Sequence, residues 1–344
     1  MTRGDARPAL PSTNVLAIDT TPLPRRRRLP GLLMIALLTT VVGGAGTLIA
    51  ARRVVDSVPR VDGVAPVLSG SSGTVDNYLL VGSDSRANGD PNTGETGDVT
   101  GNRSDTIMVL RVDKGNGSAS LLSIPRDLYV NVPGHDGKRR INSAFNDGPA
   151  VLVQTVQQEL NVPIHHYVEI DFTGFEALVE ALDGVQVCFM FPTRDTNTGL
   201  NIVAGGCYLL DGTQALAYAR SRHYEEFRDG DWHEDPTSDL GRSKRQRAFV
   251  NACLQTALAQ VKTNPFNTGS LVEAMGAAIR IDDELDPIGA ATSLRTAVGD
   301  GLQAYALPVV GQKIDGNDVL ILGDGADAVL NYFRGIGPAP APAA

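Results

Sequence analysis

The sequence predicts an α/β domain in which helices pack against a β-sheet. Short apolar runs typical of strands occur at Tyr78–Gly82, Thr106–Val112 and Ala119–Ile124. Further along the chain, strand-like runs alternate with amphipathic segments of about a dozen residues, which is the pattern of a layered α/β protein. The composition agrees, because 42% hydrophobic and 20% charged residues are ordinary values for a globular chain.

The N-terminal 50 residues predict a membrane anchor. Residues 1–28 are rich in Pro and Arg and read as a disordered cytoplasmic tail. Residues 29–50 carry no charge and are long enough to cross a hydrocarbon core of ~30 Å. More basic residues precede this segment than follow it, so we expect a single-pass protein of the cell membrane with its N-terminus in the cytoplasm. A cleaved signal peptide and a twin-arginine signal are alternatives that leave the rest of the chain outside the cytoplasm.

The remaining chain is expected to hold one folded domain. Residues 51–74 contain Pro, Gly and Ser and read as an extracytoplasmic linker. Residues 75–336 form the domain, since they show no internal repeat, and residues 337–344 form a disordered tail. Residues 1–28 have a net charge of +4 and the whole chain −9, so the chain from residue 51 onward carries −13 (−9 minus +4). This acidic body argues against nucleic acid as a partner.

Hydrophobic periodicity and turn signals predict the elements that follow the third strand. Helices are expected at 149–160, 172–182, 213–219, 240–261, 271–279 and 289–298, with a last helix ending near Arg334. Strands are expected at 166–170, 185–191, 303–309 and 319–322, and residues 192–212 read as a loop. Residues 87–102 lack periodicity and are rich in turn formers, so they read as a mobile loop over the rim of the sheet.

Two aspartates lie at the ends of neighbouring strands. Asp84 directly follows the first strand, and Asp105 directly precedes the second. Antiparallel pairing of these strands would bring both carboxylates to one rim, where their repulsion calls for a cation. Mg²⁺ binds through one or two carboxylates together with phosphate oxygens, so a pyrophosphate fits such a site. The alternative is that both aspartates form turns and pair with the neighbouring Arg86 and Arg103.

Further candidates for phosphate binding are mostly arginines. Arg126 follows the third strand, Arg220 and Arg222 end a helix-like segment, and Gln246 lies on the next helix, one turn after Arg242. Guanidinium groups bind oxyanions through two parallel hydrogen bonds. Helix C-termini favour cations in any case, and a charged helix surface explains the spacing on the later helix equally well.

The three cysteines are not spaced as metal ligands. Cys188 and Cys207 are 19 residues apart and flank the expected loop. In a domain outside the cytoplasm this suggests a disulfide. Cys253 lies on the apolar face of a helix and is expected to be buried.

Seven separated motifs then identify a resemblance. They are LLVGSDSR, RSDTIMVLRV, LLSIPRDLYV, RRINSAF, DFTGFEALVEALDGV, LDGTQALAYARSRH and DLGRSKRQRAF. With these motifs in this order, the chain from about Asp76 to Gly335 resembles the LytR-CpsA-Psr family of bacterial envelope proteins. The pair Cys188 and Cys207 and the Arg-rich, Ala-rich composition resemble the actinobacterial type. The resemblance implies a three-layer α/β/α fold with a central mixed sheet and a hydrophobic pocket for a polyprenyl chain. It makes residues 75–336 the catalytic domain.

The resemblance also implies an activity and a set of site residues. The activity is transfer of a glycan phosphate from a polyprenyl pyrophosphate carrier to peptidoglycan in cell wall assembly. Asp84 and Asp105 would hold Mg²⁺ (or Mn²⁺) and, with Arg126, would be catalytic, one aspartate acting as the base. Arg140 stands where the family commonly has Lys, which exchanges a compact donor for a planar one. The residues implied to bind pyrophosphate are Arg86, Arg103, Arg126, Arg140, Arg220, Arg222 and Gln246.

Three other functions stay open at this point. A polyprenyl pyrophosphatase would use water in place of the sugar hydroxyl. A membrane-anchored regulator of the envelope would act on transcription without enzymatic activity, although the acidic body and the orientation of the anchor argue against it. A binding module would present wall glycans without chemistry.

Overall fold

The computed structural model describes residues 58–71, 73–83, 104–263, 276, 278–298 and 301–342. The predicted cytoplasmic tail, the predicted anchor at 29–50 and the predicted loop at 87–102 lie outside these residues. Within the described part, no helix combines the length and the apolar character that a membrane span requires.

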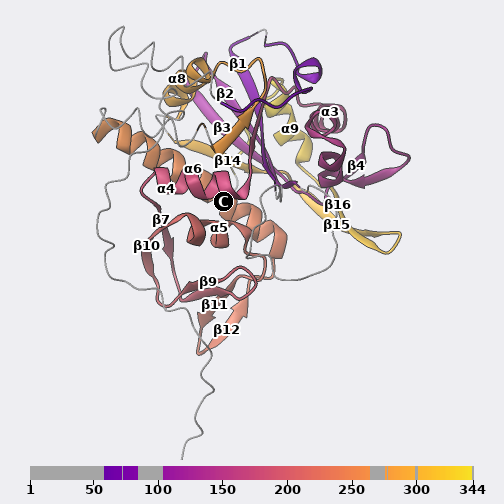
Figure 1. Ribbon diagram of the computed structural model, residues 1–344. Helices are drawn as coiled ribbons and strands as arrows, with labels where there is room; N and C mark the ends of the chain where they lie inside the picture. The colour runs from indigo at the N-terminus through magenta and orange to yellow at the C-terminus, as the bar shows by residue number, and fades with distance from the viewer. Residues whose placement is uncertain are drawn as a thin grey trace, which may run out of the picture.

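A central sheet of six strands organises the domain (Figure 1). The strands in spatial order are β13 (Ile279–Ile281), β6 (His166–Ile170), β1 (Val75–Ser83), β2 (Ser104–Asp113), β3 (Ser118–Ile124) and β14 (Leu302–Ala306). β2 pairs antiparallel with both β1 and β3, whereas β6 is parallel to β1 and β14 is parallel to β3. The sheet is therefore mixed, as expected, and the three opening strands are confirmed.

Helices cover both faces of this sheet, because successive strand residues point to opposite sides. Met108 and Leu110 of β2 belong to one core, whereas Ile107 and Val109 belong to the other. The first core includes residues of α4 (Phe172–Ala181), α5 (Gly212–Arg220), α6 (Ser238–Thr263) and α8 (Pro287–Ala297). The second includes residues of η2, a 3₁₀ helix (Ile141–Asp147), α3 (Pro149–Leu160) and α9 (Ala326–Arg334). The layers are thus helix, sheet and helix.

Two of these helices begin at aspartate caps. Asp171 accepts a hydrogen bond from the Gly174 amide at 2.7 Å at the start of α4. Asp211 accepts one from the Gln214 amide at 2.8 Å, and the Gln214 side chain accepts one in return from the Asp211 amide, which completes a capping box at the start of α5. These bonds satisfy amides that have no partner within the first helical turn. They explain why helices start after the sequences EID and LLD.

The expectation of a loop at 192–212 was wrong. This segment contains β8 (Thr193–Asp195), β9 (Leu200–Ile202) and β10 (Gly206–Leu210). The first two join β11 (Glu225–Arg228) and β12 (Asp231–Glu234) in a four-stranded sheet, and β10 pairs with β7 (Val185–Phe189). Strands of three residues are too short to show periodicity, and partners distant in sequence stabilise them.

Other short elements were also absent from the sequence-based expectations. They are η1 (Ala65–Val67), η2, the hairpin of β4 (Tyr129–Asn131) and β5 (Lys138–Arg140), and the hairpin of β15 (Val309–Ile314) and β16 (Asn317–Leu322). Of the last hairpin, only residues 319–322 of β16 were expected as a strand. The helix expected at 271–279 lies mostly outside the described residues, and Ile279 instead begins β13.

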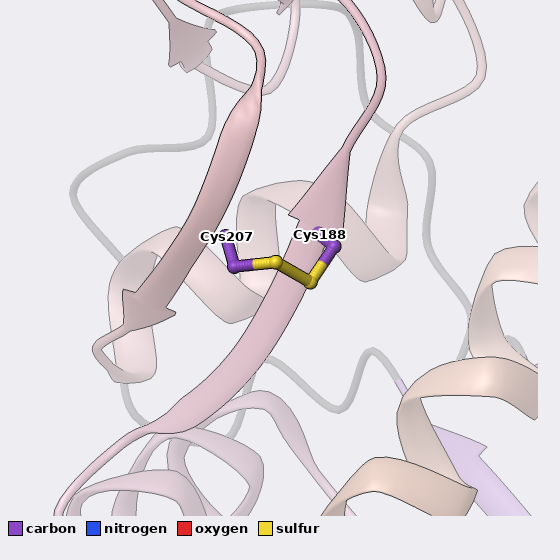
Figure 2. The surroundings of a disulfide bond; sticks show 2 residues. All are labelled: Cys188 and Cys207. Atoms are coloured by element: carbon purple, nitrogen blue, oxygen red, sulfur yellow. A yellow bond between two sulfur atoms is a disulfide. The ribbon is translucent and has the colours of Figure 1, made fainter.

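A disulfide joins Cys188 of β7 to Cys207 of β10 (Figure 2). The two residues are direct partners in the antiparallel pair, and their Cα atoms are 3.9 Å apart. The bond therefore links β7 covalently to β10, the strand that leads into the cap of α5. Cys253 is buried, as expected, and burial raises the pKa of its thiol to about 12.

Candidate functional site

One rim of the central sheet collects the ends of several strands. Ser83 at the end of β1 pairs with Ser104 at the start of β2, and Gly82 pairs with Ile170 at the end of β6. Ile124 at the end of β3 lies opposite Ile107, so the chain that continues to Arg126 leaves the sheet at the same rim. The predicted antiparallel pairing of the first two strands is confirmed.

Of the two predicted metal ligands, only Asp105 belongs to the described residues, and its backbone lies at this rim. Asp105 is a residue of β2 next to Ser104, and Asp84 follows Ser83 directly but lies, with Arg86 and Arg103, outside the described residues. Among the residues that the structure describes, no group of three or more His, Cys, Asp or Glu side chains is placed to hold a metal ion. The roles of both aspartates stay predictions.

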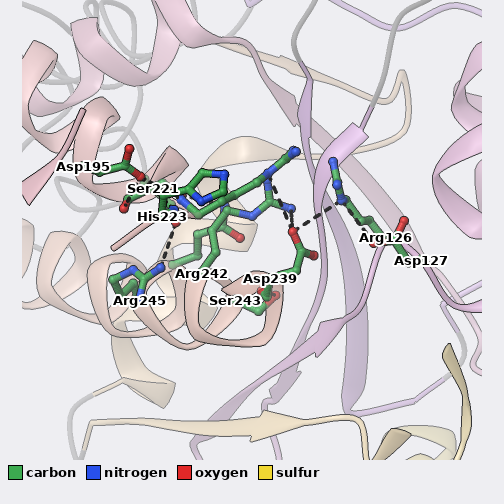
Figure 3. A network of polar contacts seen from close by, with 12 residues as sticks. Arg126, Asp127, Asp195, Ser221, His223, Asp239, Arg242, Ser243 and Arg245 are labelled. Atoms are coloured by element: carbon green, nitrogen blue, oxygen red, sulfur yellow. Dashed lines mark hydrogen bonds and ion pairs between the residues drawn. The ribbon is translucent and has the colours of Figure 1, made fainter. Parts of the chain in front are cut away.

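Three arginines surround the carboxylate of Asp239 (Figure 3). Nη2 of Arg242 lies 2.8 Å from Oδ1 of Asp239. Nε of Arg126 and Nε of Arg222 lie 3.5 and 3.7 Å from the same oxygen. We call these four residues the arginine cluster. Its net charge of +2, from three guanidiniums and one carboxylate, suits an anionic ligand.

Arg242 is the most deeply buried member of the arginine cluster, with 2% of its side chain exposed. Its position four residues before Gln246 in the sequence does not predict this burial. A charged helix surface, the usual reason for such spacing, does not apply here.

Arg220 and Gln246 line an apolar cavity together with Arg242. The guanidinium carbon of Arg220 lies 4.3 Å from the ring centroid of Phe172, which is a cation–π contact. Nε2 of Gln246 donates a hydrogen bond to the carbonyl oxygen of Ala219 at 3.0 Å. The structure therefore brings these two predicted residues next to the arginine cluster.

The cavity lies between the sheet and helices α4, α5 and α6 and has a volume of about 210 Å³. Gly82 and Thr106 line it at the rim of the sheet. The apolar lining side chains include Leu80, Met108, Val168, Phe175, Leu216, Phe249 and Val250. An apolar cavity with a few convergent polar groups is the usual form of a ligand site.

Arg140 reaches the arginine cluster through Asp127. Nε of Arg126 is 3.5 Å from Oδ2 of Asp127, and Nε of Arg140 is 3.4 Å from Oδ1 of the same carboxylate. Arg140 also donates a hydrogen bond to the carbonyl oxygen of Asp318 at 2.8 Å. Its position therefore differs from that of Arg220 and Arg222, which lie at the end of α5.

A buried carboxylate holds the segment that carries Arg222. Oδ2 of Asp195 accepts hydrogen bonds from Oγ of Ser221 at 2.7 Å and from the amides of Arg222 and His223 at 3.0 Å each. On the other side, Arg245 donates to the carbonyl oxygen of Ser221 and to Oδ2 of Asp235, both at 2.8 Å. Burial would raise the pKa of Asp195, but the hydrogen bonds from Ser221 and the amides outweigh it and hold the pKa below 3.8.

Sequence reasoning missed Asp195 and Asp239, and it named Arg242 without assigning it to the site. Asp195 lies in the segment that read as a loop, and Asp239 precedes a basic run in which an acidic residue is unremarkable. A signal for Asp239 was present, because Asp and Arg three residues apart share a helix face, as Asp239 and Arg242 do. No comparable signal exists for the contacts of Asp195 with the segment that carries Arg222, because the partners of its Oδ2 are 26 to 28 residues away.

Substituting Asp195 with alanine is expected to lower the free energy of unfolding by about 3 kcal/mol, because buried donors lose their acceptor. The folded-state pKa is depressed, so the carboxylate stabilises the fold fully above the ordinary pKa of 3.8 and loses this effect as the pH falls through the folded-state value. Chemical denaturation at several pH values measures the difference between wild type and variant. The difference should be constant near neutral pH and shrink in acid.

The exposed Asp136 provides the control for that experiment, since its alanine variant removes a carboxylate from a turn. It should unfold like the wild type at every pH. A difference for Asp195→Ala that does not change between neutral and strongly acidic pH would contradict the role of the carboxylate.

Most of the chain matches a known protein family. Residues 54–331 match the LytR_cpsA_psr family. This chain belongs to that family. The predicted family membership is therefore confirmed, and the arginine cluster and the apolar cavity are features of a LytR-CpsA-Psr domain.

Relatives with assigned names are found among envelope proteins. The chain is 36% identical over 284 residues to the probable cell wall biosynthesis protein LcpB of Corynebacterium glutamicum, which covers 80% of this chain and 64% of LcpB. It is 32% identical over 247 residues to the polyisoprenyl-teichoic acid–peptidoglycan teichoic acid transferase TagU of Halalkalibacterium halodurans, covering 72% of this chain and 73% of TagU. The aligned region thus spans less than two thirds of LcpB.

A solved structure supports the fold. The LytR-Csp2A-Psr enzyme from Actinomyces oris is 24% identical, with a TM-score of 0.61 over 83% of this chain and 99% of that one. At this level of identity the likeness establishes the mixed α/β architecture of the LytR-CpsA-Psr domain.

Proposed function

We propose that this protein transfers a glycan phosphate from a polyprenyl pyrophosphate carrier to peptidoglycan during cell wall assembly. The observation that carries the proposal is the contact between an apolar cavity and the arginine cluster, which share Arg242. A lipid pyrophosphate has the two matching parts, an apolar chain and a compact polyanion. The names of LcpB and TagU, a cell wall biosynthesis protein and a teichoic acid transferase, support the same conclusion.

The arginines would act mainly through charge. When a phosphoryl group is transferred, negative charge develops on the leaving oxygen, and donors that are already in place stabilise it without reorganisation. Arg242 is held firmly against Asp239, whereas Arg126 and Arg222 approach that carboxylate at longer range and would contact the pyrophosphate as well. The full proposed set for the pyrophosphate is Arg86, Arg103, Arg126, Arg140, Arg220, Arg222 and Gln246.

Asp84 and Asp105 are the proposed ligands of Mg²⁺ or Mn²⁺. Their donor chemistry fits, since these ions bind carboxylate oxygens together with substrate phosphate oxygens. The pairing of Ser83 with Ser104 supports a shared location for the backbone of both. A metal ion bound there would supply positive charge against the phosphate oxygens.

The reaction would be an in-line displacement at phosphorus. A sugar hydroxyl of peptidoglycan forms a bond to the phosphorus of the glycan phosphate, and the bond from that phosphorus to the bridging oxygen breaks. Polyprenyl phosphate leaves with the electron pair, and Asp84 or Asp105 takes the proton of the hydroxyl. Both substrates would meet outside the cytoplasm, which agrees with the proposed anchor at residues 29–50.

Incubating the detergent-solubilised chain with a lipid-pyrophosphate-linked glycan, peptidoglycan and MgCl₂ tests this function. We expect glycan phosphate bound covalently to peptidoglycan and one polyprenyl phosphate released for each transfer. Chelation of the metal should abolish both products, and added Mg²⁺ or Mn²⁺ should restore them. Free phosphoglycan without a wall-linked product would instead establish a pyrophosphatase, and the absence of any cleavage would favour an envelope regulator or a glycan-binding module.

A further inference from the structure

A second cavity, with a volume of about 560 Å³, lies beside the arginine cluster. Its walls come from the β4–β5 hairpin, η2 and the β15–β16 hairpin, and Arg126 and Asp127 line it. The amide of Leu320 donates a hydrogen bond to the carbonyl oxygen of Asp127 at 3.0 Å, which ties the β15–β16 hairpin to this wall. We call this cavity the polar basin.

Asp239 lies between the polar basin and the apolar cavity, because it contacts one lining arginine of each. Arg126 lines the polar basin and lies 3.5 Å from Asp239. Arg242 lies 2.8 Å from the same carboxylate and lines the apolar cavity. A pyrophosphate bound at the arginine cluster would therefore have the apolar cavity on one side and the polar basin on the other.

The polar basin has the lining of a carbohydrate site. The turns of η2 place Ile141, Ala144 and Phe145 in the core, whereas Asn142, Ser143 and Asn146 line the basin. Asn317 and Tyr129 line it from the two hairpins. Amide and hydroxyl groups donate and accept hydrogen bonds, so they match the hydroxyl and N-acetyl groups of sugars. The tyrosine ring adds an apolar face with a polar tip, which suits a sugar ring.

The charge of the polar basin suits a sugar that carries a carboxylate. Its lining holds four cations and two carboxylates, a net charge of +2, on a chain whose residues from 51 onward sum to −13. A carboxylate on the ligand would offset this positive charge.

We propose that the polar basin binds the acceptor glycan strand of peptidoglycan, an inference that rests on the proposed function. In an in-line displacement the attacking hydroxyl approaches the phosphorus from the side opposite the leaving group. Polyprenyl phosphate departs on the side of the apolar cavity, where its chain is held. The hydroxyl must then arrive from the side of the polar basin.

The donor glycan carries the same kinds of polar groups as the acceptor glycan. The experiment must therefore distinguish binding of the donor from binding of the acceptor. The double variant Asn142→Ala/Asn146→Ala removes two amides from the polar basin and keeps the buried side of η2. The main-chain hydrogen bond from the Asn142 amide to the Arg126 carbonyl, 3.1 Å long, is retained. Gln312→Ala is the matched control, because Gln312 is an exposed amide on β15 outside the lining of the basin.

The assay uses the solubilised full chain, a lipid-pyrophosphate-linked glycan and a soluble glycan fragment of peptidoglycan. We expect the double variant to raise the KM for the acceptor about tenfold, the effect of losing two neutral hydrogen bonds. The KM for the donor and the rate of donor cleavage by water should stay at the wild-type values, as should all three quantities in the control.

Calorimetric titration of the same soluble fragment into the chain without donor reports on the basin separately. The double variant should weaken binding about tenfold in this arm, even if the wild type transfers nothing and the proposed function fails. An unchanged acceptor KM and unchanged binding would overturn the inference. A raised donor KM with an unchanged acceptor KM would also overturn it and assign the polar basin to the donor glycan.

Discussion

Substituting Arg126 with alanine is expected to lower the rate of glycan transfer by about 10²- to 10³-fold, the usual effect of removing one preorganised donor from a site of developing charge. Arg126 contacts both Asp239 and Asp127 and lies between the apolar cavity and the polar basin. It would therefore face the phosphorus that is attacked. Initial rates with a lipid-pyrophosphate-linked glycan and peptidoglycan measure the effect.

Two further variants sharpen this experiment. Arg126→Lys keeps the charge but loses the planar pair of donors, so its rate should fall between those of the wild type and Arg126→Ala. Arg228→Ala is the matched control, since Arg228 pairs with Glu226 at 3.4 Å on β11 and is 43% exposed. If Arg126→Ala transferred glycan as fast as Arg228→Ala, the proposed role of Arg126 in the site would be wrong.

Filling the apolar cavity is expected to raise the KM for a long-chain donor by roughly 50-fold. Val250→Trp places a larger side chain in the cavity from α6. Each methylene of the lipid that is excluded loses about 0.8 kcal/mol of burial, and three excluded methylenes correspond to this factor. Donors with a chain too short to reach the cavity should show the same KM with the wild type and with the variant.

The control for this variant lies on the same helix. Ala248 is exposed on α6 and does not line the cavity, so Ala248→Trp should leave both KM values unchanged. Thermal unfolding checks the fold, and Val250→Trp should melt at or above the wild-type temperature because it fills empty space. Equal KM increases for long-chain and short-chain donors would show that the cavity does not hold the lipid.

Local patterns were enough to predict the central layer of this protein. Alternating residues of the opening strands, such as Ile107 and Met108, face different cores, and the apolar runs that result are visible in the sequence. Helices α4 and α5 follow from aspartate caps and periodic apolar residues, which act over a few residues. The order of the motifs identified the family, and with it Arg126, Arg220, Arg222 and Gln246 as one group.

The short strands and the walls of the polar basin depend on contacts between distant segments. β8, β9, β11 and β12 are stable because they pair with one another, and none is long enough to be recognised alone. The polar basin exists because β16 lies next to Asp127, nearly 200 residues earlier in the chain. Asn142 and Asn146 by themselves are ordinary polar residues of a short helix.

The sequence by itself determined the opening strands, most of the helices around the sheet, the family, and Arg126 and Arg222 as two of the arginines near the rim. Only the tertiary structure decided how these arginines are held and what lies on each side of them. Asp239 neutralises part of their charge, and Asp195 fixes the backbone of Arg222. The physical reason is that a strand or helix is favoured largely by residues a few positions away in the sequence. A buried ion pair forms only where segments distant in the sequence pack together and exclude water.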